Sequence, residues 1–313
     1  MRLLLVGLTA AFWLFTIPVT VRADFIVTQV VSPGDPAYTK LLGINNSTTI
    51  AGYFGDGSSI SSNGFTLTLP NTFSPENFPG AAQTVVSGIN GAGNTAGFYI
   101  DTGGTTHGFV DIGSTFATVD SPGTTFNELL GLNDSDQAAG FYQSGSDQFA
   151  YTYFSGVFTP LTSFFPVGTT ISEATDVNNA GDVTGFYGSN GFLIASGVLT
   201  TLDYPGAAST KALGLNNMGQ VVGEYVDSLG VTHGFVFDGV HYTSFDVPGS
   251  VSTVINGIND SGQIVGFFLD TNQNTVGFEG NPTATPEPRD SVLAALAVLA
   301  IGILGKYRSR YSA

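Results

Sequence analysis

Residues 257–267 have the sequence Gly-Ile-Asn-Asp-Ser-Gly-Gln-Ile-Val-Gly-Phe. Asn and Asp favour the start of a type I turn, and a following Gly supplies the left-handed residue that closes a hairpin with a bulge. We therefore predict a strand that ends in Gly-Ile, a tight turn over residues 259–262, and a second strand that ends near Phe267.

The same pattern occurs six times along the chain. Its first Asn falls at positions 45, 90, 133, 178, 216 and 259. A third strand is predicted to begin at a Gly-Phe element after each turn, as at Asn63-Gly64-Phe65, His107-Gly108-Phe109, Asn190-Gly191-Phe192 and His233-Gly234-Phe235. A fourth segment often ends in Pro-Gly. Four short strands in roughly 43 residues is the size of a propeller blade.

The two ends of the repeat region complete one another. The sixth copy stops near residues 278–280 without a fourth strand, whereas residues 25–34 look like a fourth strand without a blade. We predict an all-β, six-bladed β-propeller over residues 24–280, closed by residues 25–31, because such closure removes exposed sheet edges. A β-solenoid is the alternative fold, although its coils are usually shorter and would not need this permutation of strands.

One turn position is predicted to be left-handed in every copy, which favours Gly and disfavours β-branched residues. The residues that fall there include Gly93, Asp136, Gly181, Gly219, Gly262 and, in the first copy, Thr48. Thr48 is therefore expected to be strained.

Charge and composition exclude several classes of protein. Residues 24–280 contain 22 acidic residues and only two basic ones, Lys40 and Lys211, a net charge of −20. Such a surface repels phosphate backbones, so nucleic acid is not an expected partner. The chain has no Cys, and therefore no disulfide or thiolate metal site.

The N-terminus predicts export. Arg2 precedes an apolar run over residues 3–19, and small residues follow at Val21 and Ala23, which is the pattern of a secretory signal peptide over residues 1–23. Cleavage is expected between Ala23 and Asp24. An uncleaved N-terminal anchor is the alternative, and either segment carries the repeats out of the cytoplasm.

The C-terminus predicts a membrane-associated tail. A linker over residues 281–290 contains Pro286-Glu287-Pro288, and residues 291–313 hold a short hydrophobic helix followed by a basic cluster. The apolar stretch over residues 292–305 would span about 21 Å as a helix, short of the ~30 Å hydrocarbon core. The basic residues after it favour the cytoplasmic side, which leaves the repeats outside.

These three parts, in this order, resemble the PEP-CTERM sorting tail of bacterial exported proteins. The resemblance implies that an exosortase-like enzyme recognises and processes the tail, and that the host makes exopolysaccharide. It also implies a protein at the cell surface or released from it, anchored at least transiently in the inner membrane. An ordinary C-terminal anchor is the alternative.

The Gly-Ile-Asn-Asn and His-Gly-Phe elements resemble the bacterial extracellular HAF repeats, named for a His-Ala-Phe motif. The resemblance spans residues 24–280 and implies an extracellular role. This chain has Gly in the middle position of the motif, and its third copy has Phe149-Ala150-Tyr151 there.

The histidines and the acids near the turns are predicted to have structural roles and not to catalyse a reaction or bind a metal. His107 and His233 occupy the same repeat position, which favours packing or a backbone hydrogen bond, and His241 has no apparent partner. Asp176, Asp182 and Asp260 lie near the turns, but calcium needs six to eight oxygen ligands and these turns lack the required run of acids. Turn chemistry is therefore favoured over a calcium site.

No catalytic residue, metal ligand or cofactor is predicted. The chain lacks a Gly-x-Ser-x-Gly elbow, a zinc-type His pair and a phosphate loop, and the sequence assigns no binding residue. We predict a binding or structural module of the cell envelope or matrix, with extracellular polysaccharide as the candidate ligand. A glycosidase or lyase acting on extracellular polysaccharide is the alternative, since some pair among 24 acids always lies within catalytic distance.

Overall fold

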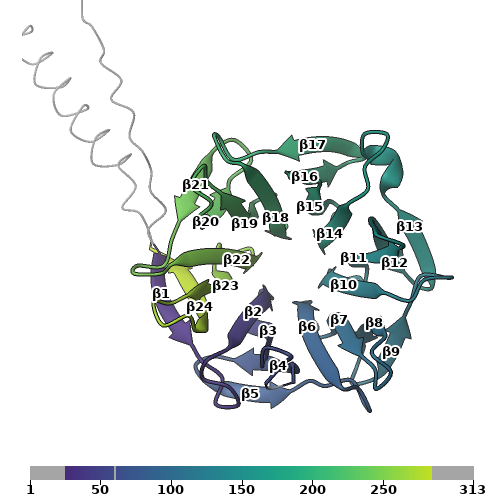
Figure 1. Ribbon diagram of the computed structural model, residues 1–313, viewed down its shortest axis with the longest axis horizontal. Helices are drawn as coiled ribbons and strands as arrows, with labels where there is room; N and C mark the ends of the chain where they lie inside the picture. The colour runs from purple at the N-terminus through teal and green to yellow at the C-terminus, as the bar shows by residue number, and fades with distance from the viewer. Residues whose placement is uncertain (1–24, 60, 284–313) are drawn as a thin grey trace, which may run out of the picture.

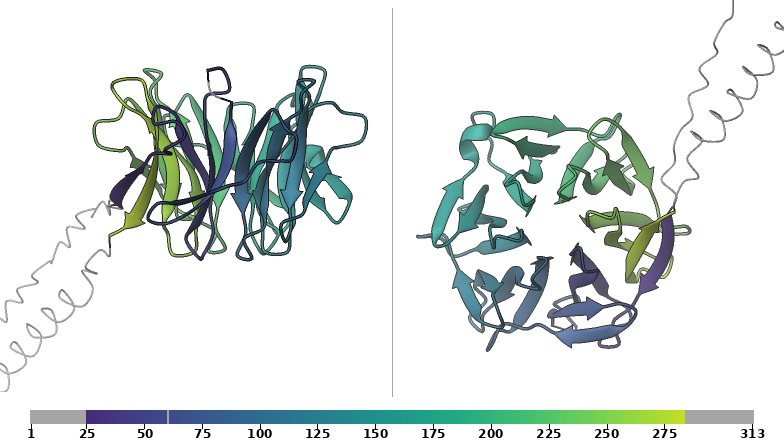
Figure 2. Two further views of the ribbon diagram at one scale, coloured as in Figure 1. Left: turned by 90° about the horizontal axis from the view of Figure 1, so that it is seen from below. Right: turned by 180° about the vertical axis from the view of Figure 1, so that it is seen from behind.

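The computed structural model describes residues 25–59 and 61–283, and this part of the chain is an all-β, six-bladed propeller (Figure 1). Six separate four-stranded antiparallel sheets surround a central axis, and the edge-on view shows their strands running between the two faces of a disc (Figure 2). Blades are numbered here by the shared Asn, so that blade 1 contains Asn45 and blade 6 contains Asn259. The only helix among the described residues is one 3-10 turn, η1 (Thr162–Phe164).

The strands follow, blade by blade from the axis outward. Blade 1 has β2 (Thr39–Ile44), β3 (Thr49–Phe54), β4 (Asn63–Thr68) and β5 (Thr72–Pro75); blade 2 has β6 (Gln83–Ile89), β7 (Thr95–Ile100), β8 (Thr106–Asp111) and β9 (Phe116–Val119). Blade 3 has β10 (Asn127–Leu132), β11 (Ala138–Ser144), β12 (Asp147–Phe154) and β13 (Val157–Pro160); blade 4 has β14 (Ser172–Val177), β15 (Val183–Tyr187), β16 (Asn190–Ala195) and β17 (Val198–Leu202). Blade 5 has β18 (Ser209–Leu215), β19 (Val221–Val226), β20 (Thr232–Phe237) and β21 (Tyr242–Phe245); blade 6 has β22 (Ser252–Ile258), β23 (Ile264–Leu269), β24 (Thr275–Pro282) and β1 (Phe25–Val30).

The N-terminal strand closes the ring, as predicted. β1 is the outermost strand of blade 6 and pairs antiparallel with β24, from Phe25 opposite Pro282 to Val30 opposite Gly277 (Figure 1). The solenoid alternative is therefore wrong. β24 continues through Asn281 and Pro282, past the predicted end of the repeat region at residue 280, because these two residues still pair with Ile26 and Phe25.

The predicted hairpin with a bulge is present in each blade. In blade 6 the Gly262 N–H donates to the Asn259 carbonyl at 3.0 Å, with Gly262 at φ +77°. A second bulge, which the sequence did not predict, shifts the register in the inner strand of all six blades shortly before the turn, as between Ile255 and Gly257. The extra residue of each bulge lines the axis.

The Gly-Phe elements explain how each blade fills its core. The aromatic residues of the third strands are buried, namely Phe65, Phe109, Tyr151, Phe192, Phe235 and Phe278. A Cβ on Gly97 of the neighbouring strand would lie 2.9 Å from the Phe109 ring. The glycine thus makes room for the ring, and the same contact recurs at Gly185 and Phe192.

Thr48 has the predicted left-handed backbone, with φ +63°. We expect Thr48→Gly to raise the melting temperature by about 2 °C. A residue with a side chain costs roughly 1–2 kcal/mol in the left-handed conformation, and Gly relieves that cost. Part of the gain is lost because Gly also increases the backbone entropy of the unfolded chain. Gly93→Thr is the matched control, since Gly93 occupies the same turn position with no neighbouring atom within 4 Å. It should lower the melting temperature. An unchanged or lower value for Thr48→Gly would show that threonine is not strained there.

The predictions for the two chain ends lie outside the described residues. They are the signal peptide with its Ala23–Asp24 cleavage site, the Pro286-Glu287-Pro288 motif, and the hydrophobic helix with its basic tail. Within residues 25–59 and 61–283, no helix is long and apolar enough to cross a membrane.

Candidate functional site

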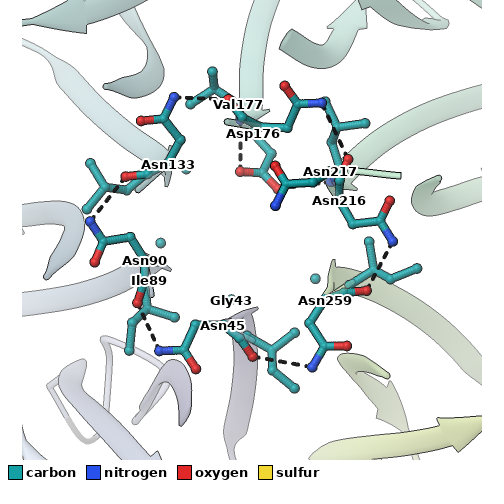
Figure 3. A pocket seen from close by; sticks show the side chains of 18 of the residues that line it. Gly43, Asn45, Ile89, Asn90, Asn133, Asp176, Val177, Asn216, Asn217 and Asn259 are labelled. Atoms are coloured by element: carbon teal, nitrogen blue, oxygen red, sulfur yellow. Dashed lines mark hydrogen bonds between the residues drawn. The ribbon is translucent and has the colours of Figure 1, made fainter. Parts of the chain in front are cut away.

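A closed ring of asparagines joins the blades at one end of the central channel (Figure 3). In each blade the Asn side chain donates from Nδ2 to the main-chain oxygen of the Asn in the next blade. In chain order, Asn45 donates to Asn90 (2.9 Å), Asn90 to Asn133 (3.1 Å), Asn133 to Asn178 (2.9 Å), Asn178 to Asn216 (3.4 Å), Asn216 to Asn259 (3.0 Å) and Asn259 to Asn45 (3.3 Å). The ring also shows that all six inner strands run in the same direction.

The same side chains hold their own turns. The Oδ1 of Asn133 accepts hydrogen bonds from the N–H groups of Ser135 and Gln137, both at 3.0 Å. One buried side chain thereby satisfies the turn and links two blades, which explains why every repeat carries it. The cavity within this end of the channel is only about 80 Å³. We assign this asparagine ring to blade closure.

Acids near the turns also form structural hydrogen bonds, between blades in the case of Asp260 and within one blade in the case of Asp182. The Asp260 carboxylate accepts hydrogen bonds from Asn217 N–H and Nδ2 and from Asn46 Nδ2, and these bonds keep its pKa below the usual value even though burial opposes them. Asp182 accepts from Asn178 Nδ2 and Ser196 N–H. Turn chemistry is confirmed for both. No group of three or more His, Cys, Asp or Glu suited to a metal occurs in the described part of the chain.

Asp176 differs from these turn acids. It lies in the inner strand β14, at a position that is Gly in the other five blades. Its carboxylate lines the channel and accepts hydrogen bonds from the N–H groups of Val177 (2.8 Å) and Leu215 (2.9 Å) (Figure 3). Burial raises its pKa to about 7, and the two hydrogen bonds only partly oppose that effect. Asp176 lies near the turn, as predicted, but its hydrogen bonds go to the inner strands of blades 4 and 5 and not to the turn.

A second ring of side chains lies toward the opposite end of the channel. Leu130, the extra residue of its bulge, lines the channel, and Glu128 lies two residues before it in the inner strand β10. The equivalent residues are Lys40, Val85, Glu128, Glu173, Lys211 and Val254, five positions before each shared Asn. At ~3.3 Å per residue they lie about 16 Å from the asparagine ring. We call these six residues the mouth ring.

Aromatic side chains surround the mouth ring. They are the cross-strand partners of its members in the second strands, namely Tyr53, Phe98, Phe141, Phe186 and Phe267, with Glu224 at this position in blade 5. Lys40 Nζ lies 4.1 Å from the Phe267 ring centroid, and Lys211 Nζ lies 4.7 Å from that of Phe186. Each ring belongs to the preceding blade, so this layer interlocks the blades by cation–π contacts.

The two carboxylates on blades 3 and 4 are unusual. Burial, and then the negative charge of Glu173, raise the pKa of Glu128 to about 8. Burial raises the pKa of Glu173 to about 7, opposed in part by the charge of Lys211. Lys211 forms its ion pair with Glu224 (3.7 Å) instead, and neither Glu128 nor Glu173 has a hydrogen-bond or ion-pair partner in residues 25–59 and 61–283. Two desolvated carboxylates, each without a hydrogen-bond partner among the described residues, thus lie on the inner strands of adjacent blades.

Sequence reasoning missed the mouth ring as a site. Lys40 and Lys211 stood out only as the two basic residues of the repeat region. Counting back from each shared Asn would have placed both lysines at one repeat position with Glu128 and Glu173.

The repeated histidines are packed as predicted, but their hydrogen bonds go to carboxylates and not to the backbone. His107 Nδ1 lies 2.7 Å from Asp120 Oδ2, and the ring stacks on Tyr99 at 4.9 Å. His233 makes the equivalent contacts with Asp246 and Tyr225. His241 also has a partner, since its Nδ1 lies 3.6 Å from Asp238 Oδ2.

We expect the folded protein to be most stable near pH 5. Burial raises the pKa values of Glu76, Glu128, Glu173 and Asp176 to about 7–8, whereas these carboxyls release their protons near pH 4 in the unfolded chain. The folded state therefore holds more protons between pH 5 and 8, and stability falls as pH rises through that window. The melting temperature at pH 8 should be at least about 5 °C below that at pH 5.

Acids whose pKa values are lowered in the folded protein set the lower pH limit of this stability maximum. Hydrogen bonds to backbone N–H groups lower the pKa values of Asp227 and Asp270, so their stabilising contribution is lost only as pH falls below about 4. Glu128→Gln should flatten the decline between pH 5 and 8, since it removes one titrating carboxyl. A melting temperature that rises from pH 5 to pH 8 would contradict the assignment of raised pKa values.

Comparisons with known proteins find similar solved structures at low sequence identity. No family model matches the chain, and no curated protein matches it. The fucose-specific lectin from Aleuria aurantia is 14% identical, with a TM-score of 0.49 over 80% of this chain and 97% of the lectin. A variant of AofleA from Arthrobotrys oligospora is 10% identical, with a TM-score of 0.49 over 80% of this chain and 85% of that one. A glycosyl hydrolase from Bacteroides ovatus is 10% identical, with a TM-score of 0.40 over 80% and 86% of the two chains.

Proposed function

We propose that this chain is an exported protein of the cell envelope or matrix, and that its propeller binds extracellular polysaccharide at the mouth ring. The observation that carries the proposal is the pair Glu128 and Glu173. Burying a carboxylate without a partner costs free energy, and residues with strongly perturbed pKa values in a cleft are candidates for function. Closure of the propeller is already accomplished by the asparagine ring and does not require them.

The side chains around Glu128 and Glu173 are of the kinds that bind sugars. The partly exposed aromatic side chains of Tyr53 and Phe98 offer apolar area, and carboxylates accept strong hydrogen bonds from hydroxyl groups. Ligand sites typically combine an apolar or aromatic lining with a few fixed polar groups. A neighbouring pocket of about 170 Å³ between blades 1 and 2, lined by Tyr53, Val85 and Phe98, extends the same surface.

The two chain ends support an extracellular setting for this module. The signal-peptide pattern over residues 1–23 and the resemblance of Pro286-Glu287-Pro288 and its flanking segments to a PEP-CTERM tail both favour export. In this proposal an exosortase-like enzyme sorts the protein through that tail. The resemblance to HAF repeats agrees with an extracellular role.

A glycosidase is the second candidate, and a specific observation favours it. Glu128 and Glu173 lie on the inner strands of adjacent blades, and burial raises the pKa values of both, to about 8 and about 7. A general acid beside a carboxylate is the requirement for glycoside hydrolysis.

A glycan array and a reducing-end assay on the same purified protein test both candidates. We expect intact glycans to be retained without new reducing ends, and Glu128→Gln and Glu173→Gln to abolish retention. Asp238→Asn is the control. This exposed residue pairs with His241 and follows Phe237, which lies opposite Val221 at the end of blade 5 that carries the asparagine turn. New reducing ends that disappear in the Gln variants would establish the glycosidase. Retention unaffected by either Gln variant would refute the mouth ring as the site.

A further inference from the structure

The connection between blades 3 and 4 differs from the other connections between blades. It runs over residues 161–171, contains η1, and is longer than its counterparts. The counterparts are residues 31–38, 76–82, 120–126, 203–208 and 246–251. Each counterpart contains Pro followed directly by Gly, whereas here Val167 stands between Pro166 and Gly168. Extra chain is thus present at the end of the propeller where the inner strands begin.

A cavity of about 270 Å³ lies at this connection. The connection supplies most of its lining, and Phe149 of β12 and Ser172 of β14 complete it. Phe149 occupies the repeat position of His107 and His233, and a phenyl ring cannot form the hydrogen bond to a carboxylate that those histidines make. The polar contact that ties the third strand to the following connection in blades 2 and 5 is therefore missing in blade 3.

The cavity has a fixed floor and an open rim. Phe165 is 7% exposed and packs on Phe192 with ring centroids 5.1 Å apart, and Ser172 Oγ accepts a hydrogen bond from Ala150 N–H at 3.0 Å. The rim residues are exposed, namely Thr162, Ser163, Pro166, Val167 and Gly168. A ligand therefore reaches the cavity without displacing a buried side chain.

The lining has the chemistry of a site for an uncharged sugar. Among the described residues no charged side chain lines the cavity, although residues 24–280 have a net charge of −20. The rings of Phe149 and Phe165 offer apolar area, and the hydroxyl groups of Thr162 and Ser163 have no hydrogen-bond partner in the described part of the chain. A sugar matches both features, because it combines apolar C–H faces with hydroxyl groups.

Other ligands fit this lining less well. An apolar side chain of a protein partner would cover the two hydroxyl groups without pairing them, which costs free energy. A sugar acid would find no positive group in the cavity, and the acidic surface would repel it. The volume is below the roughly 300–1,000 Å³ of pockets for drug-sized ligands, which suits a single sugar unit.

The cavity lies next to the mouth ring. Ser172 directly precedes Glu173 in β14, and consecutive residues are about 3.8 Å apart at Cα. Phe149 pairs with Tyr142 in β11, and Tyr142 pairs with Asn127 at the start of β10. A polymer bound at the mouth ring therefore lies close enough to place a neighbouring unit in the cavity.

We propose that this cavity binds one uncharged sugar unit of the polysaccharide, and that the protein therefore selects neutral polysaccharides over those built from sugar acids. The proposal rests on the proposed function and specifies its ligand. Phe149 contacts the apolar face of the sugar, and the hydroxyl groups of Thr162 and Ser163 bond to it at the rim. The net charge of −20 over residues 24–280 repels the acidic polymers from a distance.

Calorimetric titration of the exported protein with two probes tests the proposal. The probes are the hexamer of β-1,4-linked glucose and the hexamer of β-1,4-linked glucuronic acid, which have the same backbone and differ in charge. We expect the glucose hexamer to bind at least about tenfold more tightly at pH 7 and 150 mM salt. The methyl signals of Val167 at the rim should shift in NMR spectra when it binds.

Two variants alter the cavity and leave the mouth ring intact. Ser163→Trp fills the cavity from its exposed rim, and Phe149→His introduces the side chain that blades 2 and 5 carry. Each should lose about tenfold in affinity for the glucose hexamer. Val157→Ser is the matched control, because Val157 is 62% exposed in the hairpin at the other end of blade 3. It should bind as the parent protein does, and circular dichroism checks that every variant is folded.

The outcomes separate this proposal from the function on which it rests. Affinity that is unchanged in both cavity variants but lost in Glu128→Gln and Glu173→Gln would overturn the cavity while binding at the mouth ring stands. Affinity lost in the cavity variants alone would support the cavity and overturn the mouth ring. Equal affinity for the two hexamers would overturn the selection of neutral glycans. Failure to bind either hexamer would overturn the proposal, and the glycan array then reports separately on the proposed function.

Discussion

Deletion of residues 24–34 should unfold the propeller or lower its stability by several kcal/mol. The deletion removes β1, whose six residues pair with β24 and complete blade 6. Val30 is buried in a cluster with Leu41 and Val265, and Phe25 packs edge-on against Phe245 at 5.2 Å. Burying one such side chain contributes about 1.5–3 kcal/mol, so losing several rivals the ~5–15 kcal/mol stability of a typical domain.

Point variants within β1 provide the matched control. Val30→Ala removes a buried side chain, whereas Ile26→Ala removes one that is 64% exposed on the same strand. Urea unfolding should show a loss of about 1–3 kcal/mol for the first variant and little change for the second. Hydrogen exchange on the deletion variant gives the decisive contrast. If β23 and β24 remain protected while only blade 1 exchanges faster, β1 does not close the ring.

Replacing one member of the asparagine ring should have the next largest effect. Asn133 is 5% exposed, and its side chain accepts hydrogen bonds from two N–H groups of its turn and donates to the Asn178 carbonyl and to Gln137 Oε1. Asn133→Ala leaves these buried groups without partners, at about 1–3 kcal/mol for each group that water does not reach. We expect a total loss of about 3–5 kcal/mol in urea unfolding.

Asn179→Ala is the control for this second prediction. Asn179 also bonds to neighbouring blades, to Asp134 and through its N–H to Asn217, but its side chain is exposed and water can replace the lost partners. It should cost less than about 1 kcal/mol. Equal losses for the two variants would mean that the asparagine ring does not hold the blades together.

The fold was predictable because the features that specify it repeat. The Asn turn, its left-handed residue and the Gly-Phe element occupy equivalent positions in nearly every blade, and each has a local physical reason. Even the closing strand was visible, since residues 25–34 have the fourth-strand pattern and the sixth copy lacks one. The end of β24 at Pro282 could not be predicted in this way. It is set by pairing with Phe25 and Ile26, which are distant in sequence.

The candidate site was not predictable in the same way, because its members do not resemble each other. The mouth ring contains two Lys, two Glu and two Val, so it has no repeat signature, and its importance follows from which side chains face each other across blades. The acidic partners of the two histidines could be predicted more readily. Asp120 and Asp246 stand just before the Pro-Gly turns in blades 2 and 5, one strand from His107 and His233, yet only the antiparallel pairing brings them together.

The central claim is that ligand binds at the mouth ring, and hydrogen exchange with and without bound glycan tests it most directly. The exported protein would be compared alone and with the tightest-binding glycan of the array. We expect slower exchange at the starts of β10, β14 and β18, around Glu128, Glu173 and Lys211, and no change at the turns of the asparagine ring. Slower exchange confined to those turns or to the outer strands would contradict the account.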